Sequence, residues 1–374
     1  MTEMASGRIP SLDGLRAVSV VLVLVYHNVD WSVVGRARPL LEVVGNGQLG
    51  VSVFFVISGY LITTLLLREL DAAGSIGLKN FYLRRAFRIL PACFAYLGTV
   101  LLLARAGILE VPFREWLSSA AFLRDYVAAL GIESGRDAFT SHCWSLAVEE
   151  QFYIFWPACL AALGRRRGAW LAAGLIAASP ASRVATYLAF PGLRASLGVM
   201  AHTRLDTIMF GCLAALLADS EGFRAVVRRA TGTSLPWLAV LFAVVISPTL
   251  ARWFGGSYVL LIGYGLEGAS LTLVMLWLIG RPHSVAGQFL NNRAVAHLGV
   301  ISYSFYLWQQ LFCGLHFPWS VAPTLLMAEG SYWLIERPAL GLRGRLLRGV
   351  RPGPQPPLAA APLAAQQGGG EKLG

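Results

Sequence analysis

The sequence predicts an all-α membrane protein with about ten transmembrane helices and both termini in the cytoplasm. Two observations favour this fold class. First, 56% of the 374 residues are hydrophobic and only 14% are charged, and the mean hydropathy is +0.60; one soluble core cannot bury that much apolar surface. Second, apolar runs recur along the whole chain, and several approach the roughly 20 residues that cross a bilayer. The lipid bilayer is therefore an expected partner.

The expected transmembrane helices follow from these apolar runs. They cover residues 12–30, 48–67, 90–109, 144–163, 168–190, 205–219, 235–250, 257–280, 295–314 and 318–336. With the amino terminus inside, the cytoplasmic loops and tails hold most of the 31 lysines and arginines, which is the bias that orients membrane proteins. We expect a multi-pass protein of the cell membrane, meaning the inner or plasma membrane.

The chain divides into one membrane domain, residues 9–338, and a tail, residues 339–374. The tail begins with basic residues and continues as a low-complexity run of Pro, Ala and Gly, which we expect to be disordered in the cytoplasm. No small-residue cleavage pattern follows the first apolar run, so it is expected to stay as a helix. The polar segment 110–142 is expected to fold as an outer loop over a site. Because no internal repeat or second soluble domain is evident, any chemistry must lie on the membrane helices.

The composition also excludes several classes of partner. The formal charge of +11 suggests nucleic acid, but the arginines stand in short clusters between apolar runs, where they orient helices. We therefore expect no nucleic-acid partner. The five cysteines lie mostly in or beside apolar segments, without the paired spacing of a disulfide framework or metal site. They are interpreted as packing residues, and no metal is expected.

Polar residues within the apolar runs are the candidates for function, because a charge near the bilayer centre costs at least ~2.5–3.5 kcal/mol. In the first run, His27 follows Arg16 by eleven residues, which puts the two side chains within about 20° of one another and roughly 16 Å apart in depth. Histidine titrates near neutral pH and suits a general base that takes a proton from a hydroxyl. An interfacial histidine without a catalytic role is an equal alternative.

A cluster of arginines follows the second run. Arg84, Arg85 and Arg88 lie within about one helical turn, and arginine forks bind phosphates bidentately, so the cluster suits a donor with several phosphates such as coenzyme A. The alternative, which composition alone favours, is a positive-inside anchor that attracts anionic lipid.

Two adjacent carboxylates mark the fourth run. Glu149 and Glu150 precede a strongly apolar stretch, so we expect them to be buried. Adjacent helical residues point about 100° apart, so one carboxylate is expected to position the acceptor or the histidine while the other ties helices together. A structural polar contact between helices is the alternative. Further candidates for acceptor binding or helix contacts in and near this run are Trp144, Ser145, Gln151 and Tyr153.

The sixth run begins with a second pair of charges. Arg204 and Asp206 are two residues apart and cannot simply pair with each other on a helix. Structural ion pairing with other helices is favoured, and Glu149 or Glu150 is available for Arg204. Gly59 and Ser58, and the serines of ISYSFYLWQQ, are interpreted as small residues that allow close helix packing.

These segments, taken in order, resemble the membrane-bound acyltransferase 3 family, whose members O-acylate sugars of surface glycans, lipid-linked glycans or glycosylated metabolites. The resemblance runs from about residue 9 to residue 338. It rests on Arg16 and His27 with ten residues between them, GVSVFFVISGYLIT, FYLRRAFRILP, WSLAVEEQFYIFWP, RLDTIMFG, ISYSFYLWQ and the late IERP. Each string alone is weak, whereas seven in register are specific.

The resemblance implies O-acyl transfer, most simply O-acetylation, with acyl-CoA (acetyl-CoA) as donor substrate and no permanently bound cofactor. It implies a glycan or glycosylated acceptor, an active centre on the helix of Arg16 and His27, and a donor site near Arg84, Arg85 and Arg88. Two positions depart from the family pattern: Ser52 replaces a usual aspartate, and Gln309 replaces a histidine found in many relatives.

Together these features predict a mechanism. The arginines, with Arg16, hold the donor's phosphates, and His27 deprotonates the acceptor hydroxyl while Glu149 or Glu150 orients the imidazole or the sugar. A covalent acyl-enzyme on a serine or on His27 is an alternative route. The rival function is a transporter that uses the same buried charges as a solute pathway, but such proteins are often built from repeated halves. A non-catalytic scaffold would leave the seven motifs unexplained.

Overall fold

The computed structural model describes residue 9 and residues 11–29, 46–135 and 138–346, and within these ranges the chain is helical with no strand. This confirms the all-α expectation. The longer helices are α1 (Leu12–Asn28), α3 (Gly47–Ala73), α4 (Leu78–Arg105), α6 (Cys143–Ala189), α7 (Ala201–Leu217), α10 (Ser247–Tyr258), α11 (Tyr264–Gly280), α15 (Val321–Ser331) and α16 (Arg337–Leu346). Shorter ones are α5 (Phe113–Ala120), α8 (Glu221–Thr231), α9 (Leu235–Leu241), α12 (Val285–Leu290), α13 (Arg293–Val300) and α14 (Ser302–Trp308). The 3₁₀ helices are η3 (Arg124–Tyr126), η4 (Pro191–Ser196) and η7 (Gln309–Leu315). The π-helical segments are η5 (Phe242–Ile246), η6 (Val259–Gly263) and η8 (Tyr332–Glu336).

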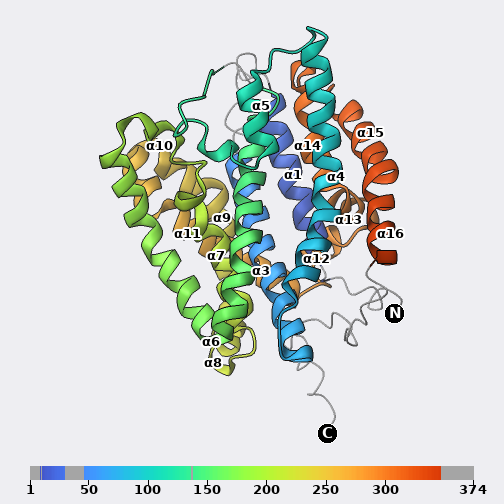
Figure 1. Cartoon of the computed structure of the whole chain (residues 1–374). Helices are drawn as coiled ribbons and strands as arrows, with labels where there is room; N and C mark the ends of the chain where they lie inside the picture. The colour runs from blue at the N-terminus through green and yellow to red at the C-terminus, as the bar shows by residue number, and fades with distance from the viewer. Residues whose placement is uncertain (1–8, 10, 30–45, 136–137, 347–374) are drawn as a thin grey trace, which may run out of the picture.

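Two glycines with a non-helical backbone conformation each divide one long helix into two parts. Gly164 lies inside α6 with φ 68°, and Gly255 lies inside α10 with φ 56°. Positive φ is readily adopted by glycine and interrupts a right-handed helix. The two halves of α6 diverge from Gly164 (Figure 1), and α9 packs against α11 on either side of Gly255. The sequence predicted a gap between the fourth and fifth helices and another between the seventh and eighth. The structure has a turn at both places.

Three expected boundaries differ from the structure. Helix α4 begins at Leu78 instead of residue 90, so the arginine cluster is carried on the helix itself. The run 295–314 is broken into α13, α14 and η7, and α13 packs so tightly on α1 that a Cβ at Gly299 would collide with the Asp13 carbonyl. Helix α16 continues past residue 338 to Leu346. The rest of the predicted tail lies outside the described residues.

Helix α3 packs between α1 and α7 near the middle of the bundle (Figure 1). The crossing of α3 with α7 is close because each helix contributes a glycine. A Cβ at Gly59 would collide with the Ile208 carbonyl, and one at Gly211 would collide with the Val56 carbonyl. Small residues of this kind let helix backbones approach each other in membranes. Gly59 therefore has the packing role that was expected of it.

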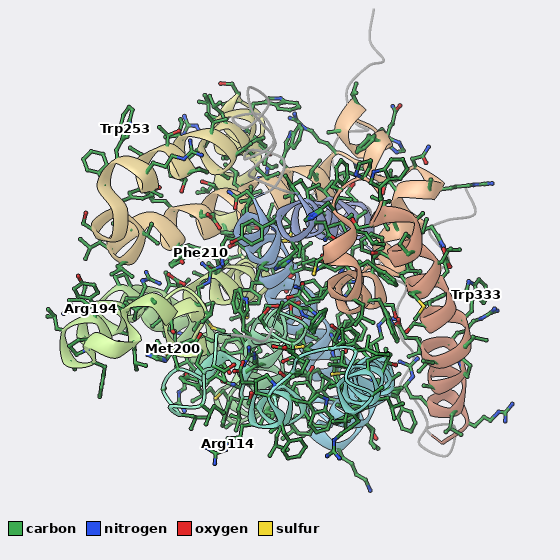
Figure 2. The ribbon with its side chains drawn as sticks, turned by 90° about the horizontal axis from the view of Figure 1, so that it is seen from above. Arg114, Arg194, Met200, Phe210, Trp253 and Trp333 are labelled. Carbon is green, nitrogen blue, oxygen red and sulfur yellow. The ribbon has the colours of Figure 1, made fainter. Side chains whose placement is uncertain are left out.

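The outer surface is apolar, as a lipid-facing surface must be. Four described segments are long and apolar enough to span a membrane as they stand: Gly47–Ala73, Leu78–Arg105, Pro191–Leu217 and Leu235–Gly280. Trp253 is 76% exposed and Trp333 is 48% exposed, and they lie at opposite sides of the bundle in Figure 2. These features indicate a membrane protein. The number of ten crossings and the cytoplasmic termini stay predictions.

Candidate active site

His27 lies at the end of α1, opposite to the end that carries Arg16. Its Nδ1 atom is 3.0 Å from the carbonyl oxygen of Val23, one turn earlier on the same helix. Nδ1 is also 3.1 Å from Nε2 of Gln309, which begins η7. The imidazole is therefore held through one nitrogen, and its position is fixed by its own helix and by a second element far away in sequence.

The amide of Gln309 is part of a buried chain of hydrogen bonds. Asn28 donates from Nδ2 to the carbonyl of Leu24 at 2.8 Å and to Oε1 of Gln309 at 3.2 Å. Both Asn28 and Gln309 are 0% exposed. Gln309, one of the two departures from the family pattern, thus contacts the predicted base directly.

A second histidine, His142, lies in electrostatic contact with His27. It immediately precedes α6, is buried, and packs between the rings of Tyr96 and Tyr306 at centroid distances of 5.5 and 5.2 Å. Its polar contact is with the backbone of Leu307, and no well-formed hydrogen bond from a described residue reaches either ring nitrogen. The sequence search missed His142 because it stands just outside an apolar run. Its place two residues before the Trp of WSLAVEE was the available signal.

The start of α6 is tied to α14 by hydroxyl groups. Tyr306 donates from its hydroxyl to the carbonyl of His142 at 2.6 Å, and its oxygen lies 2.5 Å from Oγ of Ser145. Trp144 packs edge-on against Phe55 of α3, with ring centroids 6.2 Å apart. Ser145 and Trp144 therefore fix α6 beside the two histidines.

Glu149 lies deeper along α6, toward the Arg16 end. Its Oε1 accepts a hydrogen bond of 2.6 Å from Ser58 of α3, and Ser58 accepts one of 3.1 Å from the hydroxyl of Tyr153. The cations in electrostatic range of this carboxylate are Arg16 and Arg85. Ser58, expected to be a packing residue, is a hydrogen-bond partner as well.

Glu150 faces another way, as the helical geometry required. It interacts electrostatically with Glu149 and Arg85, and also with Cys93 and Tyr303. Its Oε1 is buried without a hydrogen-bond partner among the described residues. Neither glutamate is hydrogen-bonded to His27 in the described part of the chain. The contacts that orient the imidazole come instead from Val23 and Gln309.

The arginine cluster separates into paired and unpaired members. Arg84 forms an ion pair with Glu69 at 2.9 Å, and Arg88 forms one with Glu336 of the late IERP motif at 3.2 Å. Arg85 forms no ion pair with a described residue; its guanidinium lies 4.8 Å from the centroid of the Tyr153 ring. Arg85 is thus the member of the cluster without a direct ion pair, although Glu149 and Glu150 lie in its electrostatic range.

Arg16 faces this cluster from α1. It lies in electrostatic range of Arg85 and Arg88, and its own acidic neighbour Asp13 is 3.8 Å away. Two cations, Arg16 and Arg85, therefore meet near Glu149 at the Arg16 end of the bundle. Two guanidinium groups gathered in this way suit an anionic ligand, and the acids in their range are Asp13, Glu149 and Glu150.

Arg204 and Asp206 form a separate buried cluster. Asp206 pairs with Arg183 of α6 at 2.8 Å, and both side chains are almost fully buried. Arg204 donates to Ser52 at 2.8 Å and lies 3.9 Å from the ring centroid of Tyr264. The pairing of Arg204 with Glu149 or Glu150 that the sequence suggested is not present.

The carboxylate that interacts with Arg204 is Glu267 of α11, which also contacts Ser52. Sequence reasoning missed Glu267 and Arg183, although both stand inside apolar runs. Ser52, where relatives carry an aspartate, therefore lies beside a carboxylate supplied by another helix.

Gln151 connects α6 to the outer loop. It donates from Nε2 to the carbonyl of Phe122 at 3.0 Å and to Oδ1 of Asp125 at 2.9 Å. The other oxygen of Asp125 accepts the Ala201 N–H at the start of α7. Burial raises the pKa of Asp125 to about 6, against these hydrogen bonds, which lower it. Gln151 therefore anchors the loop and does not face the histidines.

A second buried contact holds the loop in place. Arg124 and Glu115 form an ion pair at 2.7 Å, and Ser134 donates its N–H to Glu115. Burial opposes ionisation of Glu115, but the hydrogen bonds from Ser134 and Arg124 outweigh it and lower the pKa. The segment after α4 is folded, as expected, and its role as a cover over a site stays a prediction.

The bundle therefore joins two chemically different places. One holds His27, His142 and Gln309; the other holds Arg16, Arg85 and Glu149. The described residues contain no group of three or more His, Cys, Asp or Glu side chains that could hold a metal ion. A neutral imidazole and an anion-binding group connected by one helix suit transfer from an anionic donor to a hydroxyl.

Comparisons with known proteins identify the family of the chain. A family model described as an acyltransferase domain matches residues 9–334. The protein named "Putative O-acetyltransferase" of Staphylococcus aureus (strain COL) is 30% identical over 366 residues, which cover 88% of this chain and 57% of that protein. The O-acetyltransferase OatA of the same strain is 27% identical over 387 residues, 90% of this chain and 58% of its own length.

The chain thus spans less than two thirds of the length of these relatives. No solved structure matches it. The family match covers most of the chain and includes the helices that carry both places described above. The chain therefore belongs to the family of membrane acyltransferases that this acyltransferase-domain model represents.

Proposed function

We propose that this protein is an integral membrane O-acyltransferase of the cell membrane that moves an acetyl group from acetyl-CoA to a hydroxyl of a glycan or glycosylated acceptor. The names of the relatives support acetyl as the group and oxygen as the acceptor atom. The observation that carries the proposal is the placement of Arg16 and His27 on one helix, with Arg85 beside the first and a buried hydrogen-bond chain at the second.

The donor binds through its phosphates at the Arg16 end. Arg85 and Arg16 are the cations that take these phosphates, since Arg84 and Arg88 are engaged by Glu69 and Glu336. A guanidinium presents a planar fork that matches phosphate oxygens. Tyr153 holds the Arg85 guanidinium by a cation–π contact and keeps it available.

The thioester reaches from this end toward His27. The two ends of α1 differ in depth by roughly 16 Å between Arg16 and His27, a distance comparable to an extended pantetheine arm. The acyl carbon then lies near His27 while the phosphates remain with Arg85. Helix α1 therefore acts as one wall of the donor path, with α3 and α13 packed beside it.

In the reaction, the acceptor oxygen attacks the thioester carbonyl carbon and forms the C–O bond. His27 takes the hydroxyl proton, the C–S bond breaks, and the coenzyme A thiolate leaves and is protonated. His27 performs this step from the tautomer in which Nδ1–H donates to the Val23 carbonyl, because only then does Nε2 carry the lone pair. A covalent acyl-enzyme on a serine or on His27 would divide the same transfer into two steps.

The test is a transfer assay with protein purified in detergent and returned to liposomes. [Acetyl-¹⁴C]acetyl-CoA and a panel of glycan fragments with free hydroxyls are supplied, and both base-labile acetyl ester and free coenzyme A thiol are measured. We expect ester and thiol in equal amounts. Thiol release without ester on any acceptor would mean hydrolysis, and movement of unreacted solute across the liposome membrane would instead favour a transporter; either result contradicts the proposal.

A further inference from the structure

Two neighbours of His27 make opposite demands on the same nitrogen. The carbonyl oxygen of Val23, 3.0 Å from Nδ1, can only accept a hydrogen bond. The amide nitrogen of Gln309, 3.1 Å from Nδ1, can only donate one. A neutral imidazole carries one proton, so Nδ1 satisfies Val23 when it is protonated and Gln309 when it is not. The two contacts belong to two different tautomers.

The orientation of the Gln309 amide follows from the backbone. The Leu24 carbonyl accepts a hydrogen bond from Asn28, so the nitrogen of the Asn28 amide must face it. The same nitrogen faces Gln309, which must therefore present its oxygen to Asn28 and its nitrogen to His27. If the nitrogen and oxygen of the Gln309 amide were exchanged, its N–H groups would face those of Asn28 in a fully buried place. Two buried donors without an acceptor cost free energy. The donor face of Gln309 is thereby directed at Nδ1.

We propose that Gln309 is a positioning residue that sets which nitrogen of His27 carries the proton. At rest, Gln309 donates to Nδ1 and the ring proton is on Nε2. The base form arises when Nε2 releases its proton to water and Nδ1 takes a proton from water. The new Nδ1–H group then donates a hydrogen bond to the Val23 carbonyl. The catalytic consequence rests on the proposed function of His27, whereas the tautomer itself does not.

Among the described residues, Val23 and Gln309 make the hydrogen-bond contacts of the His27 ring, and Gln309 is the side chain of the two. Among the described residues, the titratable side chain of another element in electrostatic range of His27 is His142, and Arg124 of the outer loop is in electrostatic range of His142. On α1 itself the neighbouring ring is Tyr26, edge-on at 5.2 Å. No carboxylate is hydrogen-bonded to His27 in the described part of the chain. A single amide donor facing Nδ1 disfavours its protonation, because the N–H dipole opposes the added proton.

The test compares two variants of adjacent buried glutamines. Gln309→Met keeps a side chain of similar length and removes the donor, while Asn28 keeps its bond to Leu24. Gln310→Met is the matched control: Gln310 is also buried, and its Oε1 has no hydrogen-bond partner among the described residues. Long-range ¹H–¹⁵N spectra of histidine-labelled protein in detergent report the tautomer, and the His27 signal is assigned by its loss in His27→Gln.

We expect the wild type and Gln310→Met to show His27 protonated on Nε2, and Gln309→Met to show it protonated on Nδ1. An unchanged tautomer in Gln309→Met, or the same change in Gln310→Met, would overturn the inference. A Gln309→Glu variant, whose carboxylate accepts from Nδ1, should give the Nδ1 form as well. If Gln309→Met fails to fold, Gln309→Glu decides by the same spectrum.

A kinetic readout separates this inference from the proposed function. For Gln309→Met we expect the acid-side midpoint of kcat/KM against pH to move up by about one pH unit, because the opposing N–H group is gone. A shift of the tautomer without any transfer by the wild type would contradict the proposed function and leave the inference standing. A transfer-competent wild type whose midpoint is unmoved in Gln309→Met would contradict the kinetic role of Gln309.

Discussion

The division of the arginine cluster predicts that its members differ in donor binding. In Arg85→Gln the side chain keeps its length but loses its charge and its fork. A hydrogen bond to a charged group contributes about 1.5–3 kcal/mol, so losing one phosphate contact should weaken coenzyme A binding roughly 10- to 150-fold. The cation–π contact with Tyr153 is lost as well, at a cost in protein stability of about 0.5–1 kcal/mol.

Arg84→Gln is the matched control, since it removes the same charge from the same helix one residue away. Its ion pair with Glu69 is partly exposed, with side-chain exposures of 38% and 25%. Pairs of this kind contribute at most about 1 kcal/mol to stability. We therefore expect Arg84→Gln to leave coenzyme A affinity nearly unchanged.

Isothermal titration of coenzyme A into each purified variant measures the difference directly. The loss in Arg85→Gln should shrink as salt is added, because exposed electrostatic contacts are screened. Equal weakening by Arg84→Gln and Arg85→Gln would refute the reasoning, since the cluster would then act only by its summed charge. Unchanged coenzyme A affinity in both variants would indicate that the arginine cluster only orients the helix in the membrane.

Three further predictions address stability and topology. Glu267→Gln should lower the melting temperature because Arg204 loses the carboxylate in its electrostatic range, and adding Ser52→Asp should restore most of that loss. No rescue would show that Ser52→Asp cannot replace the Glu267 carboxylate beside Arg204. Burial raises the pKa of Asp125 from near 4 to about 6, so the folded loop binds the proton more tightly than the unfolded chain and stability falls as pH rises from about 4 through 6. Asp125→Asn should lack this fall in melting temperature, and an identical pH profile would contradict it. Reporter fusions at Glu133 and at the carboxyl end should read opposite sides of the membrane, and like-sided readings would overturn the proposed topology.

The elements that sequence reasoning predicted best are those with local causes. Hydropathy located the helices, and a glycine with positive φ made a real turn at Gly164 between two of them. The α13–α14 region was predicted less well, and it contains the close approach of Gly299 to Asp13, two residues far apart in sequence. A hydropathy window does not contain that contact.

The same distinction between local causes and contacts far apart in sequence applies to the polar residues. The sequence indicated that Arg204 and Asp206 need partners, because an unpaired buried charge is costly. It could not identify Glu267 and Arg183, because a partner is chosen by helix packing and not by spacing. His142 was missed for another reason: it precedes an apolar run, and only the fold carries it inside.

The departure at Gln309 shows what the structure adds to a motif. As a sequence feature it was only a missing histidine, whereas in the fold its amide lies 3.1 Å from the predicted base. The expected orienting role of Glu149 or Glu150 has no hydrogen bond to support it in the described residues. Glu149 is bound to Ser58 at the other end of the site.

The most direct test of the central claim is acyl transfer by purified His27→Gln. Glutamine keeps a polar side chain of similar reach but cannot accept a proton at neutral pH. Base catalysis by a positioned side chain contributes about 10²- to 10⁴-fold, so the rate of ester formation per folded molecule should fall by that factor while coenzyme A still binds. A wild-type rate in His27→Gln would contradict the account and direct the search for the base to Glu149 or Glu150.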